Sequence, residues 1–274
     1  MQIIFLMRYA VAGTAGASGY SAFPPAFVFG AGVWLCSIAF TYLYNGVTDV
    51  REDRANGSGR PIARGALPVT VARAAAWTLA ATALTGGILL GPAMFVVTLG
   101  MLLLGYAYSA PALALKSRTP ATIAVVVASG FLTYAAGALC GAVPLTVELL
   151  VFAVAMTLWM GMVGAIAKDF SDDVGDAKHG RRNWTILWGR TVTACIVSLS
   201  ALGIGAGVLV SAVELDAPAL LVPGFVVLGG ALVLSAAALT ARAGDTRSRR
   251  RRPYRIFMIT QYTAHCVVLA QPVV

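Results

Sequence analysis

The stretch ATIAVVVASGFLTYAAGALCG, residues 121–141, decides the fold class. It holds no charged side chain and is as long as the roughly 20 apolar residues with which an α-helix crosses the membrane hydrocarbon. A membrane β-barrel would instead show short strands in which apolar and polar residues alternate. Because this run is continuously apolar, and because backbone groups in lipid must be satisfied internally, we predict an all-α membrane protein.

The rest of the chain repeats this pattern. Of its 274 residues, 59% are hydrophobic and 11% are charged, whereas a soluble domain carries roughly 25% charged residues. We predict nine transmembrane helices, at about residues 7–23, 27–45, 70–90, 93–110, 119–140, 148–168, 190–212, 218–240 and 254–273.

The basic residues predict how these helices are oriented. All 20 Lys and Arg residues lie at the start of the chain or in every second connection, while the connections near Gly91, Ala142 and Leu215 hold none. By the positive-inside rule, the N-terminus is cytoplasmic and the chain is an integral, multi-pass protein of the cell inner membrane. The tract RSRRRRP, residues 247–253, is interpreted as an orientation signal that contacts anionic lipid, with nucleic-acid binding as the alternative.

Seven of the eleven acidic residues lie in two predicted cytoplasmic segments. In the first, residues 42–67, a continuing helix would align Asn45, Asp49 and Asp53 on one face, at i, i+4 and i+8. In the second, an i, i+3, i+4, i+7 pattern aligns four aspartates: Asp169, Asp172, Asp173 and Asp176.

The negative charge of such clusters needs a cation to compensate it. Like charges stacked on a helix repel by roughly 0.2–0.5 kcal/mol per pair, and carboxylates near a membrane cost more. Carboxylates with an amide oxygen, and with no Cys or His in the pattern, suit Mg²⁺, which keeps waters and shares phosphate oxygens. We therefore expect two Mg²⁺ ions with a diphosphate between them. Plain interfacial residues are the alternative, which explains one or two of these carboxylates but not seven.

The same segments resemble motifs of the UbiA superfamily of intramembrane prenyltransferases. NGVTDVRED, residues 45–53, resembles its NxxxDxxxD motif, and KDFSDDVGDAKHG, residues 168–180, resembles its KDxxDxxGDxxxG motif. RPIARG, residues 60–65, resembles the family's RPxxxG segment, and GYAYSAPALALK, residues 105–116, resembles its aromatic–Pro–Lys segment. The four segments keep the family's order, and the resemblance covers the whole chain.

This resemblance implies a single domain over residues 1–274, in which nine helices surround a central cavity that opens to the cytoplasm. It implies a Mg²⁺-dependent transfer of a prenyl group from an allylic prenyl diphosphate to a small acceptor, in most of the family an aromatic ring. One Mg²⁺ would be bound by Asn45, Asp49 and Asp53, and the other by Asp172 and Asp176, with Asp169 completing the second cluster or its outer shell. Gly46 stands where the family commonly has an acid, and Asp173 where it often has an apolar residue.

The resemblance also assigns roles outside the two motifs. Donors to the diphosphate oxygens are expected from Arg60, Lys116, Arg64 and Arg181. Aromatic faces stabilise a carbocation by roughly 0.5–2 kcal/mol each, and the candidates for this prenyl pocket are Tyr106, Tyr108, Tyr42 and Trp159. Their alternative role is the interfacial aromatic belt. Arg8 is a candidate for binding an acceptor carboxylate, or else a topology charge.

Three other functions remain open at this point. A UbiA-type terpene cyclase would use the same ions, with the prenyl chain's own double bond as the nucleophile. A transporter would place its acids near the middle of the membrane in broken helices, whereas these acids lie at span ends. A non-catalytic membrane scaffold would need no divalent-metal site.

Overall fold

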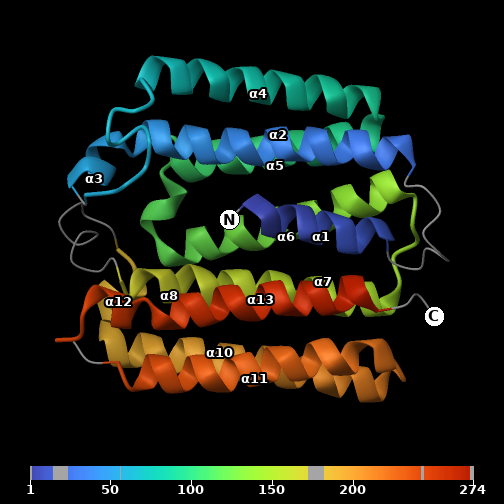
Figure 1. Ribbon diagram of the computed structural model, residues 1–274, viewed down its shortest axis with the longest axis vertical. Coiled ribbons are helices and arrows are strands. Elements are labelled where there is room, and N and C mark those ends of the chain that lie inside the picture. Colours follow the sequence, from blue (N-terminus) through green and yellow to red (C-terminus); the bar gives the residue numbers. More distant parts are fainter. Residues whose placement is uncertain (1, 15–23, 56, 172–181, 242–243, 272–274) are drawn as a thin grey trace. The chain divides into compact units, whose positions relative to one another are not determined.

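In the computed structural model of the protein, helices joined by short connections make up the described part of the chain (Figure 1). That part comprises residues 2–14, 24–55, 57–171, 182–241 and 244–271. Its only β-type feature is an isolated bridge between Arg118 and Arg182, so the all-α prediction is confirmed. The chain divides into two compact units: unit 1, residues 1–116, 131–145 and 273–274, and unit 2, residues 117–130 and 146–272.

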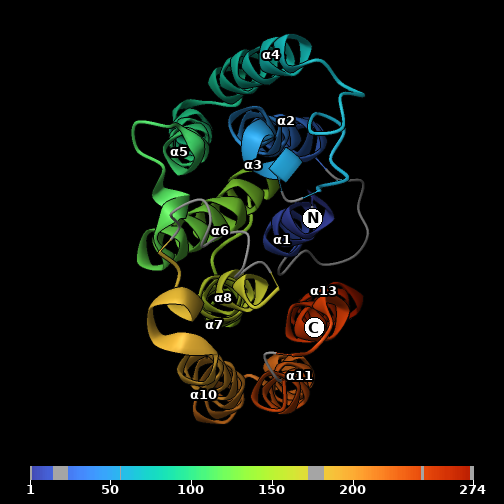
Figure 2. The same ribbon diagram turned by 90° about the vertical axis from the view of Figure 1, so that its left-hand side faces the viewer.

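In unit 1, one long helix packs against two others. Figures 1 and 2 both show α2 beside α4 and α5, and a buried core that includes Phe40, Tyr44 and Leu102 joins them. A proline opens α2 and another opens α5, where its missing N–H has no helical partner to lose. The helices of this unit are α1 (Gln2–Thr14), α2 (Pro25–Thr48), α3 (Val50–Ala55), α4 (Val69–Leu89) and α5 (Pro92–Ser109).

The second half of α6 (Thr119–Gly141) packs closely against α1 within unit 1. A Cβ atom at Gly137 would overlap the carbonyl oxygen of Tyr9, and one at Gly141 would overlap that of Gly13. Glycine permits this close approach of two helices. Beside it, Arg8 on α1 is completely buried.

Unit 2 contains the remaining helices. Its first span is continuous but changes geometry: α7 (Val147–Leu158) leads into the π-helix η2 (Trp159–Gly164) and then α8 (Ala165–Asp169). Helix α10 lies next to α11, and α11 also lies next to α13 (Figures 1 and 2). The further elements are α10 (Trp184–Glu214), η3 (Pro218–Leu220), α11 (Leu221–Leu239), α12 (Arg247–Arg250) and α13 (Arg252–Ala270).

The chain's polar residues set several helix boundaries in unit 2. The side chains of Thr146 and Asn183 accept hydrogen bonds from backbone N–H groups in the first turns of α7 and α10, at 3.2 and 3.0 Å. Gly189 interrupts α10 with a φ of 77°, a conformation that costs little only for glycine. The predicted span from residue 190 therefore begins correctly after the break, and a short helical segment precedes it.

Among the described residues, six helical segments are long and apolar enough to cross a membrane, judged by length and composition. They coincide with six of the nine predicted spans: Pro25–Thr48, Pro92–Ser109, Thr119–Gly141, Val147–Asp169, Trp184–Glu214 and Pro218–Leu239. The other three predicted spans fall on α1, α4 and α13, whose described residues do not meet the same standard. Nine crossings and a cytoplasmic N-terminus therefore stay predictions.

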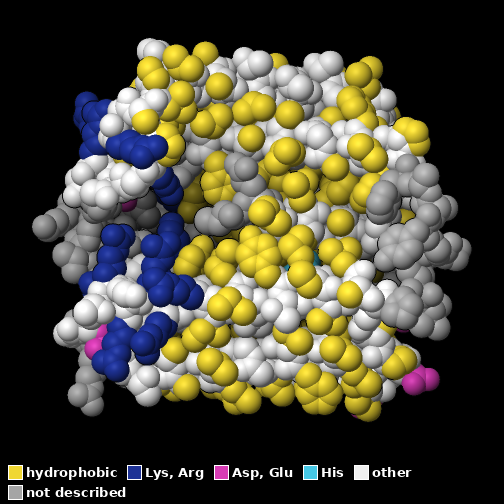
Figure 3. Space-filling model, in the orientation of Figure 1, with side chains coloured by type: hydrophobic (Ala, Val, Ile, Leu, Met, Phe, Trp, Pro, Cys, Tyr) yellow, Lys and Arg dark blue, Asp and Glu magenta, His cyan; other side chains and the backbone are white. Residues whose placement is uncertain are grey.

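The surface of unit 2 is apolar along the sides of its helices and basic near α12. Large apolar side chains such as Leu199, Val213 and Phe225 stand exposed on the sides of α10 and α11. On the face drawn in Figure 3, Lys and Arg gather over α12 and the start of α13. Apolar helix sides with a basic end suit a segment that lies in lipid and reaches an aqueous boundary.

Candidate active site

The first acidic motif lies where α2 ends and α3 begins. Asn45 is in the last turn of α2, Asp49 caps that helix, and Asp53 is in α3. The backbone continues with helical bonding across this junction, because Asp49 N–H donates to the Asn45 carbonyl at 3.0 Å and Asp53 N–H to the Asp49 carbonyl at 2.7 Å. The expected i, i+4, i+8 alignment is thus present.

Side-chain hydrogen bonds connect the motif internally and to α5. Asn45 Nδ2 donates to Asp49 Oδ2 at 2.9 Å and to Ser109 Oγ at 3.2 Å. Thr48 Oγ1 lies 3.3 Å from Asp49 Oδ1 as a further donor. Ser109 lies inside the quoted segment 105–116 but was not predicted as a site residue. The signal available in the sequence was a hydroxyl residue at the end of an apolar span, and the structure buries this residue.

Two cations from later connections pair with the two carboxylates. Lys116 Nζ forms an ion pair with Asp49 Oδ1. Arg60 Nη1 donates to Asp53 Oδ2 at 2.9 Å and lies 3.5 Å from Asn45 Oδ1. One continuous polar network therefore contains all three motif residues and two of the four predicted diphosphate donors.

The two ion pairs differ in their exposure to solvent. The side chains of Lys116 and Asp49 are 11% and 9% exposed, whereas those of Arg60 and Asp53 are 46% and 15% exposed. Because water screens exposed charges, the Lys116–Asp49 pair is the stronger electrostatic contact.

The loop that carries Arg60 is anchored by its apolar residues. Ile62 is buried in a small cluster with Val47, Val50 and Ala72. Arg54 Nε donates to the Ala63 carbonyl at 3.0 Å, which ties the loop back to α3. The predicted donor Arg64 is exposed, and its backbone N–H bonds to the Arg60 carbonyl at 3.1 Å.

The predicted aromatic residues of unit 1 lie in two environments. Tyr106 stacks on Tyr44 with ring centroids 5.4 Å apart, and Trp77 lies 6.3 Å from Tyr106. Tyr106 is 39% exposed, which leaves open both the prenyl-pocket role and the interfacial role. Tyr42 and Tyr108 are half-buried on α2 and α5.

Arg8 is completely buried in unit 1, and its guanidinium lies 5.9 Å from the centroid of the buried Tyr134 ring. A charge in such a place is costly without aromatic and polar neighbours. Tyr134 comes from the half of α6 that packs on α1, so the glycine-lined helix contact also positions this cation–π pair.

The second motif is described only at its beginning, in unit 2. Asp169 is the last residue of α8 and is half-buried, and the buried Phe170 follows it. Arg190 Nη1 donates to the Phe170 carbonyl at 3.3 Å, and its guanidinium lies 5.2 Å from the Phe170 ring centroid. Arg190 therefore fixes the end of α8, a role that sequence reasoning missed. The predicted residues Asp172, Asp173, Asp176 and Arg181 lie outside the described residues.

The predicted pocket residue Trp159 lies in the π-helix and is completely buried. Its indole N–H donates to the Phe257 carbonyl at 3.4 Å, and the two rings stack with centroids 6.3 Å apart. Gly164 lies against the same Phe257 ring, where a Cβ atom would overlap it. In unit 2, Trp159 thus packs η2 against α13.

The first motif provides a ligand set that suits Mg²⁺. Among the described residues, no group of three His, Cys, Asp or Glu side chains is arranged to hold a metal. Mg²⁺ does not require one, because it commonly binds one or two carboxylates and completes its shell with waters and substrate phosphates. The carboxylates of Asp49 and Asp53, with the amide oxygen of Asn45, are hard oxygen donors held in one network.

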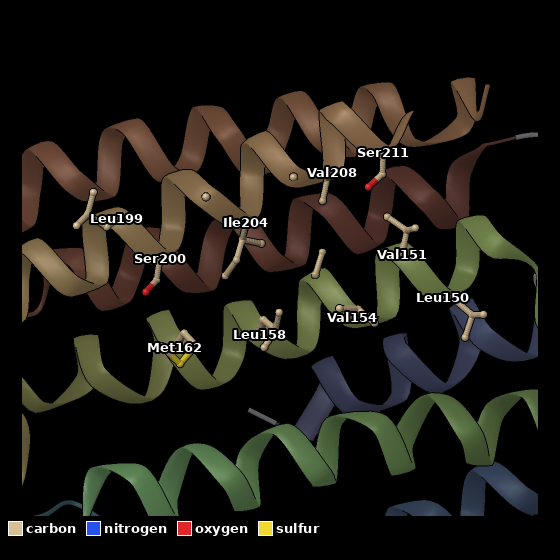
Figure 4. A pocket seen from close by; sticks show the side chains of 13 residues that line it. Leu150, Val151, Val154, Leu158, Met162, Leu199, Ser200, Ile204, Val208 and Ser211 are labelled. Carbon is tan, nitrogen blue, oxygen red and sulfur yellow. The ribbon is translucent and has the colours of Figure 1, made fainter. Parts of the chain in front are cut away.

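A groove of about 590 Å³ in unit 2 has a different character (Figure 4). It lies between the α7–η2 segment and α10, and no charged residue lines it; Ser200 and Ser211 are its polar side chains. Its lining therefore offers no charged group to a metal or a diphosphate.

Comparison with known proteins agrees with the fold and identifies the family. The model of the UbiA prenyltransferase family matches residues 6–260. A UbiA homologue from Archaeoglobus fulgidus, solved with DMAPP and Mg²⁺, has 18% identity, a TM-score of 0.71, and coverage of 98% of this chain and 96% of its own. An apo UbiA homologue from Aeropyrum pernix K1 has 14% identity, a TM-score of 0.73 and the same coverages.

A third similar structure is a digeranylgeranylglyceryl phosphate synthase. It is 13% identical, with a TM-score of 0.70, and the match covers 99% of this chain and 92% of the synthase. No curated protein sequence matches the chain. At these identities the structures establish the fold, while the family model spans nearly the whole sequence. The chain is therefore an integral, multi-pass membrane protein that belongs to the UbiA prenyltransferase family.

Proposed function

We propose that the protein is a Mg²⁺-dependent intramembrane prenyltransferase, which moves a prenyl group from an allylic prenyl diphosphate to an aromatic acceptor. The observation that carries this proposal is the polar network of unit 1. It combines oxygen ligands for a metal, Asn45, Asp49 and Asp53, with two cations that suit phosphate oxygens, Arg60 and Lys116.

The proposed metal sites follow the two motifs. Asn45, Asp49 and Asp53 would hold one Mg²⁺, and Asp169, Asp172 and Asp176 would hold a second. When bound, Mg²⁺ supplies Lewis-acid neutralisation of the diphosphate leaving group. The remaining work falls to the protein's own side chains.

Protein cations complete the neutralisation of the diphosphate. Lys116 and Arg60 donate to its oxygens, and Arg64 and Arg181 extend the donor set at the cytoplasmic opening. Each donor stabilises the departing charge more than the intact ester, which lowers the barrier to cleavage of the allylic C–O bond.

The apolar helices and aromatic rings protect the allylic cation until the acceptor attacks. Water would capture this cation, so the reaction needs a dry surrounding. Tyr42, Tyr106, Tyr108 and Trp159 are the aromatic residues proposed for this role, and Arg8 is proposed to bind an acceptor carboxylate. The whole chain, residues 1–274, is proposed to form a single catalytic domain. Its active site is proposed to open to the cytoplasm.

The test is a screen of prenyl diphosphates of increasing length against aromatic acceptors, with the purified full chain in nanodiscs and product mass as the readout. We expect a prenylated acceptor and released pyrophosphate in Mg²⁺, loss of both in EDTA, and recovery when Mg²⁺ is restored. A cyclic hydrocarbon or terpene alcohol formed without acceptor would identify a terpene cyclase instead. Absence of pyrophosphate release from every donor would refute both.

A further inference from the structure

The metal-binding carboxylates of unit 1 are already paired with protein cations. Both oxygens of Asp49 have donors: Lys116 and Thr48 at Oδ1, and Asn45 at Oδ2. Asp53 Oδ2 accepts from Arg60, which also reaches the amide oxygen of Asn45. Each of the three proposed metal ligands therefore has an oxygen that faces Lys116 or Arg60.

Electrostatic competition follows from this arrangement. A divalent cation that approaches Asp49 alone meets the ammonium group of Lys116 at the same oxygen, in a setting where both side chains are about nine-tenths buried. Displacing Lys116 would leave a dehydrated ammonium group without its carboxylate, which is unfavourable. A diphosphate changes this balance, because its oxygens offer the displaced ammonium and guanidinium groups new charge-assisted hydrogen bonds.

We propose that Lys116 and Arg60 close the first motif to a bare metal ion, and that a diphosphate opens it by drawing both cations onto its own oxygens. The ion pairs Lys116–Asp49 and Arg60–Asp53 are then the resting contacts of residues that bind the diphosphate in the loaded site. This inference rests on the proposed function, since it takes the diphosphate as the ligand.

Positive coupling between the two ligands is the measurable consequence. A diphosphate that releases Asp49 and Asp53 raises the affinity for Mg²⁺, and by linkage Mg²⁺ raises the affinity for diphosphate by the same factor. The site then discriminates against free divalent metal and accepts metal together with substrate. Lys116 has the larger part in this, because its ion pair is the less exposed of the two.

The experiment is equilibrium dialysis of Mg²⁺ against the detergent-solubilised full chain, with and without inorganic pyrophosphate on both sides of the membrane. The variants are Lys116→Gln, Lys116→Arg and Arg60→Gln, with thermal melting as a check on folding. Arg51→Gln is the matched control, because Arg51 is exposed on α3 beside the motif and the structure shows no pairing of it with a carboxylate of the described residues. It removes one positive charge without breaking either ion pair.

We expect pyrophosphate to tighten Mg²⁺ binding to the wild-type chain by about tenfold or more. Without pyrophosphate, Lys116→Gln should bind Mg²⁺ about fivefold tighter than wild type, and Arg60→Gln about twofold tighter. Lys116→Arg should behave like wild type, and Arg51→Gln should change the affinity less than either uncharged variant. Pyrophosphate should tighten Mg²⁺ binding to Lys116→Gln much less than to wild type.

Two results would overturn the inference. One is a Lys116→Gln variant that binds free Mg²⁺ no tighter than Arg51→Gln does, and the other is the absence of coupling in the wild-type chain. Should Lys116→Gln fail to fold, Arg60→Gln decides by the same comparison. Release of pyrophosphate from a prenyl diphosphate by the wild-type chain is measured separately, so the proposed function can stand while this inference falls. A wild-type chain that binds no Mg²⁺ under either condition overturns both.

Discussion

The two helix ends that carry acidic motifs are built differently. In unit 1, α2 is a regular helix whose end is stabilised by charge, through Lys116 and Arg60 on Asp49 and Asp53. In unit 2, the span contains a π-helix, and the end of α8 is fixed by Arg190 on the backbone and ring of Phe170. Among the contacts described, charge pairs hold the first end, and a backbone hydrogen bond and a cation–π contact hold the second.

Removing a charge at the first helix end should have the largest effect. We predict that Asp49→Asn lowers kcat/KM for prenyl transfer by about a thousandfold, because it removes a proposed metal ligand and the partner of Lys116. Steady-state kinetics of the purified variant, with melting to confirm folding, measures this. Asp245→Asn is the control, since Asp245 pairs with Arg249 on unit 2. Equal losses in both variants would contradict the assignment.

Packing at the second helix end is tested by Gly164→Ala. The added Cβ would overlap the Phe257 ring, which is itself packed on Trp159, and overpacking of this kind costs about 1–3 kcal/mol. Unfolding in mixed micelles should show the loss, and adding Phe257→Leu should recover part of it.

Gly203→Ala on α10 is the matched control for that substitution. Its Cβ would meet nothing within 4 Å, so the free energy of unfolding should not decrease. A loss of stability as large as that of Gly164→Ala would show that helical glycines matter in unit 2 for a reason other than contact with Phe257.

The contact of Arg190 with Phe170 tests the second helix end with a smaller expected loss of stability. Arg190→Gln should destabilise unit 2 by about 1 kcal/mol, because it removes a cation–π contact and a hydrogen bond to a helix-terminal carbonyl. The same unfolding assay measures this, and Arg190→Lys, which keeps the charge, should recover only part of the loss. If Arg190→Gln and the wild-type chain have the same free energy of unfolding, Arg190 is not needed to fix the end of α8.

The smallest effect on folding is expected from Arg60→Gln. Its ion pair with Asp53 is largely exposed on the arginine side, so the free energy of unfolding should change by less than about 0.5 kcal/mol. The variant should nevertheless raise KM for the prenyl diphosphate. A large loss of stability with an unchanged KM would show that Arg60 stabilises the fold and does not bind the diphosphate.

The sequence was most informative where length and hydropathy alone determine structure. The predicted span 119–140 corresponds to Thr119–Gly141, and the predicted span 148–168 to Val147–Asp169. The π-helix was not predictable, because η2 is as apolar as the helix around it and differs only in its hydrogen bonding. Hydropathy also cannot predict the break at Gly189, which separates the short helical segment 184–188 from the rest of α10.

The candidate site was predicted in its residues more than in its contacts. Spacing along one helix is enough to align Asn45, Asp49 and Asp53. Their partners Lys116 and Ser109 are more than 60 residues away, and only the tertiary packing of α2 with α5 brings them together. The same limit explains why Lys116 and Arg60 were named only as diphosphate donors, while the structure pairs these two residues with Asp49 and Asp53.

The glycine-lined contact of α1 with α6 has a consequence for biosynthesis. Arg8 is synthesised 126 residues before its aromatic neighbour Tyr134. At about 5–20 residues per second, this leaves an interval of roughly 6–25 s in which α1 has no such neighbour. Holding an arginine in lipid is unfavourable during that time, so α1 should wait at the membrane boundary or beside the insertion machinery until the rest of unit 1 has been translated.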